Sequence, residues 1–215
     1  IHAIVSAFGV LANLADDIRN LQRTEIGEVG EAFEATQVGS STMPHKRNPW
    51  NFEHVKSMWK EFMPRMITMY ADQISEHQRD LTNSASGRFV PEIVVGFVAA
   101  VDRLTRVMKK LVVDQERMER NFDLTKEMVI AEPLYILLAS LGHPNAHEAV
   151  RLLTLESQKT GKTLRELLVE QSALFPYWSK LTPNQREALE NPEKYIGWAA
   201  QKAEAICNNW EKKLF

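Results

Sequence analysis

Three long segments of this chain repeat apolar residues at the spacing of one face of an α-helix. They cover residues 1–21, 49–75 and 91–113, and each carries a broad apolar stripe. Stripes this wide leave little surface for water, so we expect a long-helix bundle that needs partner chains to cover it. Pro64 is expected to kink the second helix. Since no stretch alternates apolar and polar residues as a strand would, the sequence predicts an all-α fold.

Shorter helices with frequent stops follow Asp114, and this change predicts a domain boundary. Residues 1–113 are interpreted as part of the helical bundle, and residues 114–215 as a smaller all-α C-terminal domain. Pro133 is expected to interrupt one helix, and residues 175–178 are expected to form an apolar loop. Capping boxes are predicted for two pairs, Asn145 with Glu148 and Thr163 with Glu166.

The composition excludes several classes of protein. With 44% hydrophobic residues, 25% charged residues and a formal net charge of −2, the chain is typical of a globular protein and favours neither a nucleic-acid nor a membrane partner. No apolar run approaches the ~18 residues that a membrane span requires. The single cysteine, Cys207, is interpreted as a small core residue and fits the reducing cytoplasm. The histidines show no ligand spacing, so we expect no metal and no cofactor.

A polar stretch, GSSTMPHKRNP at residues 39–49, separates the first two long segments and is called the signature loop below. Asn48 followed by Pro49 predicts a helix start with Asn48 as the cap. Free N–H groups and the helix dipole would favour an anion there, and Lys46 adds a mobile positive charge. Composition alone leaves a second interpretation open, in which this is a capped surface loop.

The signature loop resembles the consensus of the fumarase and aspartase superfamily, G-S-S-x-M-P-x-K-x-N-P. All fixed positions are matched, namely Gly39, Ser40, Ser41, Met43, Pro44, Lys46, Asn48 and Pro49. The resemblance implies that Ser41 is the catalytic base and that Lys46 and Asn48 hold substrate carboxylates. It places Ser40 in the substrate site as a support of the loop, together with Met43. His45 stands at a variable position and is interpreted as peripheral.

A second polar segment, residues 75–90, breaks the helical pattern again and reads SEHQRDLTNSASGRFV. Its many turn-forming residues favour a connection between two helices. However, Arg79 and Arg88 on either side of Ser84 also offer two guanidinium groups and a hydroxyl, which suit a phosphate. The run from Glu76 to Arg88 resembles the segment of adenylosuccinate lyases in which an arginine, a serine and a second arginine at this spacing contact the phosphate of AMP.

The resemblance to adenylosuccinate lyases extends over most of the chain and weakens after about Phe175. It implies elimination of fumarate from adenylosuccinate, and from the related succinyl-carboxamide ribotide of purine synthesis, in homotetramers whose sites draw on three subunits. The histidine that acts as general acid in such enzymes has no counterpart here. We therefore expect a truncated chain that is inactive by itself.

Other functions stay open on the sequence. Carboxymuconate cycloisomerase and argininosuccinate lyase share nearly the same signature, although Arg79, Ser84 and Arg88 have no evident role with a substrate that lacks a phosphate. A non-catalytic helical assembly protein would have no reason to keep Ser41 with Lys46. A generic three-helix interaction module would account for the periodicity but for neither polar segment.

Overall fold

The computed structural model describes residues 1–33, 42, 43, 45–74 and 81–214. The chain divides into two compact units, Ile1–Arg120 and Asn121–Phe215. This division lies beyond the one expected after residue 113, because the segment that follows still bonds to the first unit. The amide of Asp114 donates to the carbonyl of Glu28 over 2.8 Å, and Arg117 Nη1 donates to the carbonyl of Thr24 over 3.4 Å.

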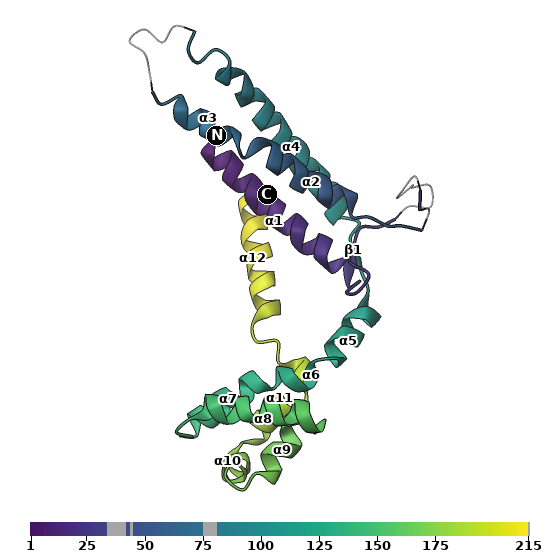
Figure 1. The fold of residues 1–215 in the computed structure, drawn as a ribbon, viewed down its shortest axis with the longest axis vertical. Coiled ribbons are helices and arrows are strands. Elements are labelled where there is room, and N and C mark those ends of the chain that lie inside the picture. The colour runs from purple at the N-terminus through teal and green to yellow at the C-terminus, as the bar shows by residue number, and fades with distance from the viewer. Residues whose placement is uncertain (34–41, 44, 75–80, 215) are drawn as a thin grey trace. The chain divides into compact units, whose positions relative to one another are not determined.

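The first unit is built from long helices that pack side by side (Figure 1). They are α1 (His2–Leu21), α2 (Trp50–Phe62), α3 (Arg65–Ala71) and α4 (Phe89–Met108), with a 3-10 turn η1 (Ser86–Arg88) before α4. Helices α1, α2 and α4 meet in one core of buried side chains, which are Phe8, Ala15, Ile18, Phe52, Val55, Ala100 and Leu104. The helical prediction for the three long segments is confirmed, and part of the apolar stripe of α1, α2 and α4 turns toward this core.

Pro64 divides the second segment into two helices. Helix α2 ends at Phe62 and α3 begins at Arg65, because a proline removes one backbone N–H and crowds the preceding turn. Arg65 pairs with Glu61 and with Glu92, the latter on α4. These two carboxylates, through hydrogen bonds and charge, raise the pKa of Arg65 further above its usual range. Arg65, the first residue of α3, thus connects the break between α2 and α3 to α4.

Two very short strands were not predicted. Strand β1 (Val29–Gly30) pairs antiparallel with β2 (Val112–Val113), with Val29 opposite Val113. Two residues are too few to show an alternating pattern, which is why the sequence carried no strand signal. The all-α class is confirmed, since this small ladder only ties the connection after α1 to the segment after α4.

The second unit holds the shorter helices. They are α6 (Lys126–Val129), α7 (Ala131–Ser140), α8 (Ala146–Thr160), α9 (Leu164–Glu170), α10 (Phe175–Lys180), α11 (Pro183–Glu190), the 3-10 turn η2 (Pro192–Lys194) and α12 (Ala199–Leu214), while α5 (Gln115–Asp123) crosses the division. Leucines dominate the buried core, among them Leu134, Leu138, Leu153, Leu164, Leu167 and Leu168. Among the described residues of the whole chain, no helix combines the length and apolar character that crossing a membrane requires.

Four local predictions in this unit are corrected. The helix breaks at Ile130 rather than at Pro133, because Pro133 lies in the first turn of α7, where its missing N–H is not needed. Residues 175–178 begin α10 instead of forming a loop. Cys207 is exposed on α12 rather than buried in a core. Asn145 makes no side-chain cap bond, and Glu148, the partner expected for its capping box, pairs with Arg151 instead.

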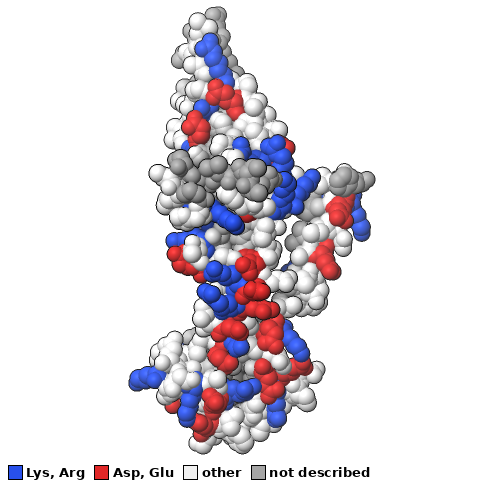
Figure 2. All heavy atoms as spheres, turned by 90° about the vertical axis from the view of Figure 1, so that its right-hand side faces the viewer, with Lys and Arg blue, Asp and Glu red and all other residues white. Residues whose placement is uncertain are grey.

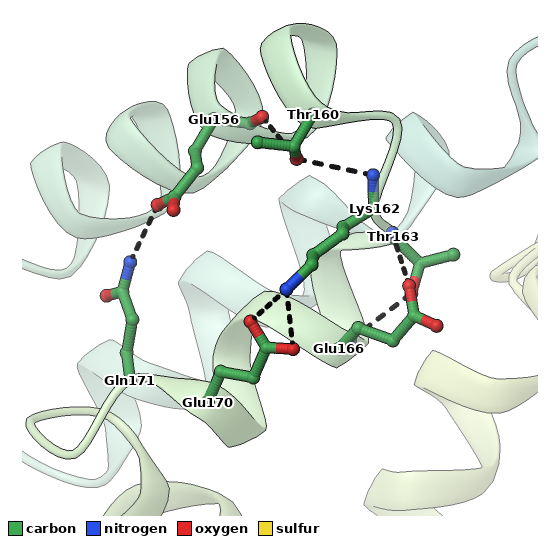
Figure 3. A network of polar contacts seen from close by, with 7 residues as sticks. All are labelled: Glu156, Thr160, Lys162, Thr163, Glu166, Glu170 and Gln171. Carbon is green, nitrogen blue, oxygen red and sulfur yellow. Dashed lines mark hydrogen bonds and ion pairs between the residues drawn. The ribbon is translucent and has the colours of Figure 1, made fainter.

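The capping box at the start of α9 is confirmed and lies within a polar network (Figure 3). The hydroxyl of Thr163 accepts from the amide of Glu166 over 3.2 Å, and the carboxylate of Glu166 accepts from the amide of Thr163 over 2.8 Å. Lys162 reaches both carboxylate oxygens of Glu170 over 2.8 and 2.7 Å. The turn between α8 and α9 is therefore held by side chains on both of its sides.

Candidate active site

An open pocket of about 940 Å³ lies in the first unit, where α1 ends and α2 begins. Its walls come from the connection after α1, the end of the signature loop, the first turn of α2 and the segment after β2. Lys46 and Asn48, the two residues expected to hold carboxylates, both line it. His45, expected to be peripheral, lines it as well. Together with Arg47 and Pro49, five consecutive signature-loop residues therefore line one cavity.

The pocket is rich in charges of both signs. The basic residues of its lining are Arg19, Arg23, Lys46, Arg47 and Arg117. The acidic residues are Glu25, Glu28, Glu31, Glu53 and Asp114. Figure 2 looks onto the right-hand side of Figure 1, and blue and red side chains adjoin each other on this face. A substrate that carries both acidic and basic groups would find partners for each in such a pocket.

The N-terminus of α2 differs from the expectation. Pro49 takes the cap position without a side-chain bond, so Asn48 is not the helix cap. The carboxylate of Glu31 takes that role, because its Oε1 accepts from the amides of Asn51 over 2.8 Å and Phe52 over 3.1 Å. The site expected to favour an external anion is thus filled by an anion of the chain itself.

Several pocket residues were missed by the sequence analysis. Arg19 and Glu53 lie on helices, whereas Arg23 and Glu31 lie in the connection after α1, so none of them belongs to the signature loop. One signal in the sequence could have identified Glu53. It lies in the first turn of the predicted helix, and that turn is adjacent to the signature loop. The arginines had none, because their distance along the chain from the signature loop conceals their closeness in space.

The second polar segment forms a turn where the structure describes it. The amide of Ser84 donates to the carbonyl of Leu81 over 3.1 Å, and Ser86, which is buried, donates its hydroxyl to Asp72 Oδ1 over 2.8 Å. Ser84 and Arg88 are exposed. The interpretation as a connection between helices is therefore confirmed for residues 81–88, and Ser84 and Arg88 remain accessible to a ligand.

The two groups of predicted site residues lie at opposite ends of the bundle (Figure 1). Helix α4 separates them along its 20 residues, or roughly 30 Å at the usual rise of an α-helix. Within one chain, Lys46 and Asn48 are consequently not brought together with Ser84 and Arg88. Three further predicted residues, Ser40, Ser41 and Arg79, lie outside the described residues.

Metal ligation finds no support in the described part of the chain. No group of three or more histidine, cysteine, aspartate or glutamate side chains is close enough there to hold an ion. Near the pocket, burial and then the positive charge of Arg103 lower the pKa of His54 below its ordinary value of 6.5. A histidine that stays neutral in this way can accept or donate hydrogen bonds near neutral pH without adding charge.

Comparisons with known proteins point to one family. The family described as adenylosuccinate lyase C-terminal matches residues 75–196, and the family described as lyase matches residues 2–63. The chain is 40% identical over 205 residues to the adenylosuccinate lyase of Pyrococcus abyssi, covering 94% of this chain and 45% of that protein. It is 37% identical over 216 residues to that of Methanothermobacter thermautotrophicus, covering 95% and 47%. The chain thus spans about half the length of these curated relatives.

Solved structures agree on the fold. The 3-carboxy-cis,cis-muconate lactonizing enzyme of Pseudomonas putida superposes with a TM-score of 0.73 at 30% identity, over 91% of this chain and 44% of that one. The β-carboxy-cis,cis-muconate cycloisomerase of Acinetobacter calcoaceticus superposes with a TM-score of 0.75 at 24% identity, over 96% and 44%. Since the family match over residues 75–196 covers more than half of the sequence, this chain belongs to the adenylosuccinate lyase C-terminal family.

Proposed function

We propose that the chain works as part of an adenylosuccinate lyase, a C–N lyase that eliminates fumarate from adenylosuccinate and leaves AMP. The same site would take the related succinyl-carboxamide ribotide of purine nucleotide synthesis. The observation that carries the proposal is that Lys46 and Asn48 line a charged pocket in a chain whose family match is to adenylosuccinate lyases. No cofactor is needed for this chemistry.

The proposed reaction begins with loss of a proton from the carbon next to a carboxylate. Ser41 accepts that proton, the electron pair delocalises into the carboxylate, and the C–N bond then breaks as an acid protonates the leaving nitrogen. Lys46 and Asn48 stabilise the charge that accumulates on the carboxylate, and Ser40 supports Ser41. A serine hydroxyl is not basic at neutral pH, so Ser41 requires nearby N–H donors and positive charge.

The nucleotide phosphate would be held by the second polar segment. Arg79 and Arg88 supply guanidinium groups that can bind phosphate oxygens with two hydrogen bonds each, and Ser84 supplies a hydroxyl. The exposure of Ser84 and Arg88 supports this role, because neither side chain is buried in the bundle of its own chain. A substrate with two carboxylates and a phosphate would require all of these groups around one molecule.

One chain cannot surround such a substrate, so we propose a homotetramer whose sites are shared between subunits. Helix α4 supports this assembly, because it exposes a row of large apolar side chains that water disfavours, namely Val94, Val95, Val98 and Val101. Each site would combine the Lys46 end of one subunit with the Arg88 end of another. By itself, the chain is then inactive.

Fumarate release by the full-length protein tests the proposal. We expect turnover of adenylosuccinate, little turnover of argininosuccinate or carboxymuconate, and loss of activity in Ser41→Ala. Ser179→Ala serves as the matched control, because Ser179 lies on α10 in the other unit, where its hydroxyl donates to the carbonyl of Pro176 over 2.9 Å. AMP binding is expected to weaken in Arg79→Ala.

Preferential turnover of carboxymuconate would instead favour the cycloisomerase function that names the relatives found among the solved structures. Unchanged fumarate release in Ser41→Ala would remove the catalytic assignment, and unchanged AMP binding in Arg79→Ala would remove the phosphate assignment.

A further inference from the structure

Glu31 makes an unusual contact for a residue that precedes the signature loop. Its carboxylate bonds to the first turn of α2 with both oxygens, since Oε1 takes the two backbone amides and Oε2 accepts from Asn51 Nδ2 over 2.6 Å. A charged acceptor at a helix N-terminus satisfies orphan N–H groups and complements the helix dipole. The segment before the signature loop is therefore bonded directly to the helix that follows it.

Gln22 extends this contact to the signature loop itself. Its Oε1 accepts from the amide of Glu31 over 2.8 Å, and its Nε2 donates to the carbonyl of Arg47 over 3.3 Å. Arg47 lies between Lys46 and Asn48, so the bond holds the backbone between the two pocket residues. Gly30 leaves the room for this bridge, because a Cβ there would lie 2.9 Å from Gln22 Oε1.

Helix α4 secures the other side of the same contact. Arg103 Nη1 donates to Asn51 Oδ1 over 2.9 Å, and its guanidinium lies 5.5 Å from the ring centre of Trp50. The amide of Asn51 is thereby oriented, with its oxygen toward Arg103 and its nitrogen toward Glu31. The Glu31 carboxylate accepts a hydrogen bond from that nitrogen with its second oxygen. A glutamine whose single oxygen stayed on the backbone amides would place its NH2 group, a donor, against the NH2 group of Asn51.

We propose that Glu31 is a positioning residue. Its carboxylate caps α2, its backbone amide bonds to Gln22, and Gln22 in turn holds the Arg47 backbone so that Lys46 and Asn48 face the pocket. The effect on turnover rests on the function proposed above, whereas the effect on the backbone does not. Glu31 itself need not touch the substrate. Its contribution is the fixed geometry of two residues that do, and a displacement of about 1 Å in such groups can cost ~100-fold in rate.

A reciprocal exchange of side chains tests this inference in the full-length protein. Glu31→Gln removes the charge and sets two donors against each other, and Asn51→Asp alone sets two carboxylates against each other. The double variant restores matched partners, because the new amide can donate to the new carboxylate while Arg103 still donates to its other oxygen. Glu190→Gln, an exposed glutamate at the end of α11, controls for the loss of one charge.

We expect Glu31→Gln to lower kcat for fumarate release about 10- to 100-fold, with a smaller change in KM. The reason is that Lys46 and Asn48 stabilise negative charge that builds up on the substrate carboxylate only as the proton leaves. Amide hydrogen exchange at Asn51 and Phe52 becomes faster in the same variant. The double variant recovers most of both losses, and Glu190→Gln changes neither.

Three results would overturn the inference. Wild-type exchange rates at Asn51 and Phe52 in Glu31→Gln would show that the cap does not hold this segment. Unchanged kcat would show that the contact does not position Lys46 and Asn48. Recovery of exchange protection without recovery of kcat would reduce Glu31 to a structural role. If the wild-type protein does not turn over adenylosuccinate, the proposed function fails, and the exchange rates of the single and double variants still decide the role of Glu31.

Discussion

Gly96, in the middle of α4, shows how one absent side chain sets the distance between two helices. A Cβ at this position would lie 2.1 Å from Cε2 of Phe62 on α2, far inside contact distance. The Phe62 ring has little room to withdraw, because its centroid lies 6.1 Å from that of Phe8 and Arg65 lies 5.2 Å above it. The close approach of α2 and α4 therefore depends on glycine.

Gly96→Ala is expected to destabilise the first unit. Overpacking costs about 1–3 kcal/mol, and at a contact this short the cost outweighs the ~1 kcal/mol that alanine contributes to a helix interior. Gly87→Ala is the control, because a Cβ there meets no atom within 4 Å. Urea unfolding of both variants measures the difference, and equal stabilities would show that Phe62 moves aside freely.

His54 lies on α2, and its charge state depends on Arg103. Burial and then the positive charge of Arg103 lower its pKa below 6.5. As pH falls below that value, the unfolded chain binds a proton before the folded chain does, so the free energy of unfolding decreases. We expect Arg103→Gln to raise the pKa of His54 toward 6.5 and to lessen this loss of stability on acidification.

An NMR titration of the His54 ring checks this shift. Arg106→Gln is the matched control, since Arg106 lies on the same helix and pairs with Asp102 over 2.9 Å. An unchanged pKa in Arg103→Gln would leave burial as the only cause.

The turn between α8 and α9 shows how one element is ended and the next begun. Gly161 ends α8 in the left-handed region with a φ of 73°, which glycine adopts at little cost. The hydroxyl of Ser157 donates to the carbonyl of Lys162 over 2.6 Å, and Thr163 then caps α9. The ion pair of Lys162 with Glu170 (Figure 3) is exposed and adds little, so the bonds of the Ser157 and Thr163 side chains to the backbone carry most of this turn.

Thr163→Ala is expected to destabilise α9 by about 1 kcal/mol, because the amide of Glu166 loses its acceptor. Asn145→Ala, at the N-cap of α8, is the matched control and should cost less, since Asn145 makes no side-chain cap bond. Amide hydrogen exchange along α8 and α9 reports both effects. Similar losses in the two variants would contradict the difference drawn between these caps.

Each subunit of the proposed tetramer carries two partial sites, one at each end of its long helices. The pocket holds Lys46 and Asn48, while Ser84 and Arg88 are exposed at the far end of α4. Neither end holds both the residues that we assign to the carboxylates and those that we assign to the phosphate. Activity is thus a property that we assign to the assembly rather than to the chain.

Mixing of inactive variants tests the shared site. Full-length Lys46→Ala and Arg88→Ala are each expected to be inactive, because each lacks one part of every site. When the two are co-expressed, some sites combine an intact Lys46 with an intact Arg88 from different subunits, and fumarate release returns. Co-expressed tetramers that stay inactive would place both residues of a site in one chain and would contradict the proposed assembly.

Helix content was predictable because apolar periodicity is a local property. The stripes of residues 1–21 and 91–113 required no knowledge of their partners, and the capping box at Thr163 needed only a spacing of three residues. The cap of α2 was predicted wrongly for the opposite reason. Asn48 was the nearest suitable residue in the sequence, whereas Glu31 reaches the helix only because the chain folds back.

The sequence by itself determined the all-α class, the position of the signature loop and which of its side chains we propose as reactive, because periodicity and motif spacing are written along the chain. Only the tertiary structure decided that Glu31 rather than Asn48 caps α2, and that Lys46 shares a pocket with Arg19 and Glu53. It also decided that the second polar segment lies a helix length away from that pocket. Contacts between distant segments depend on how the helices pack, and packing is settled by the shapes of all the buried side chains together.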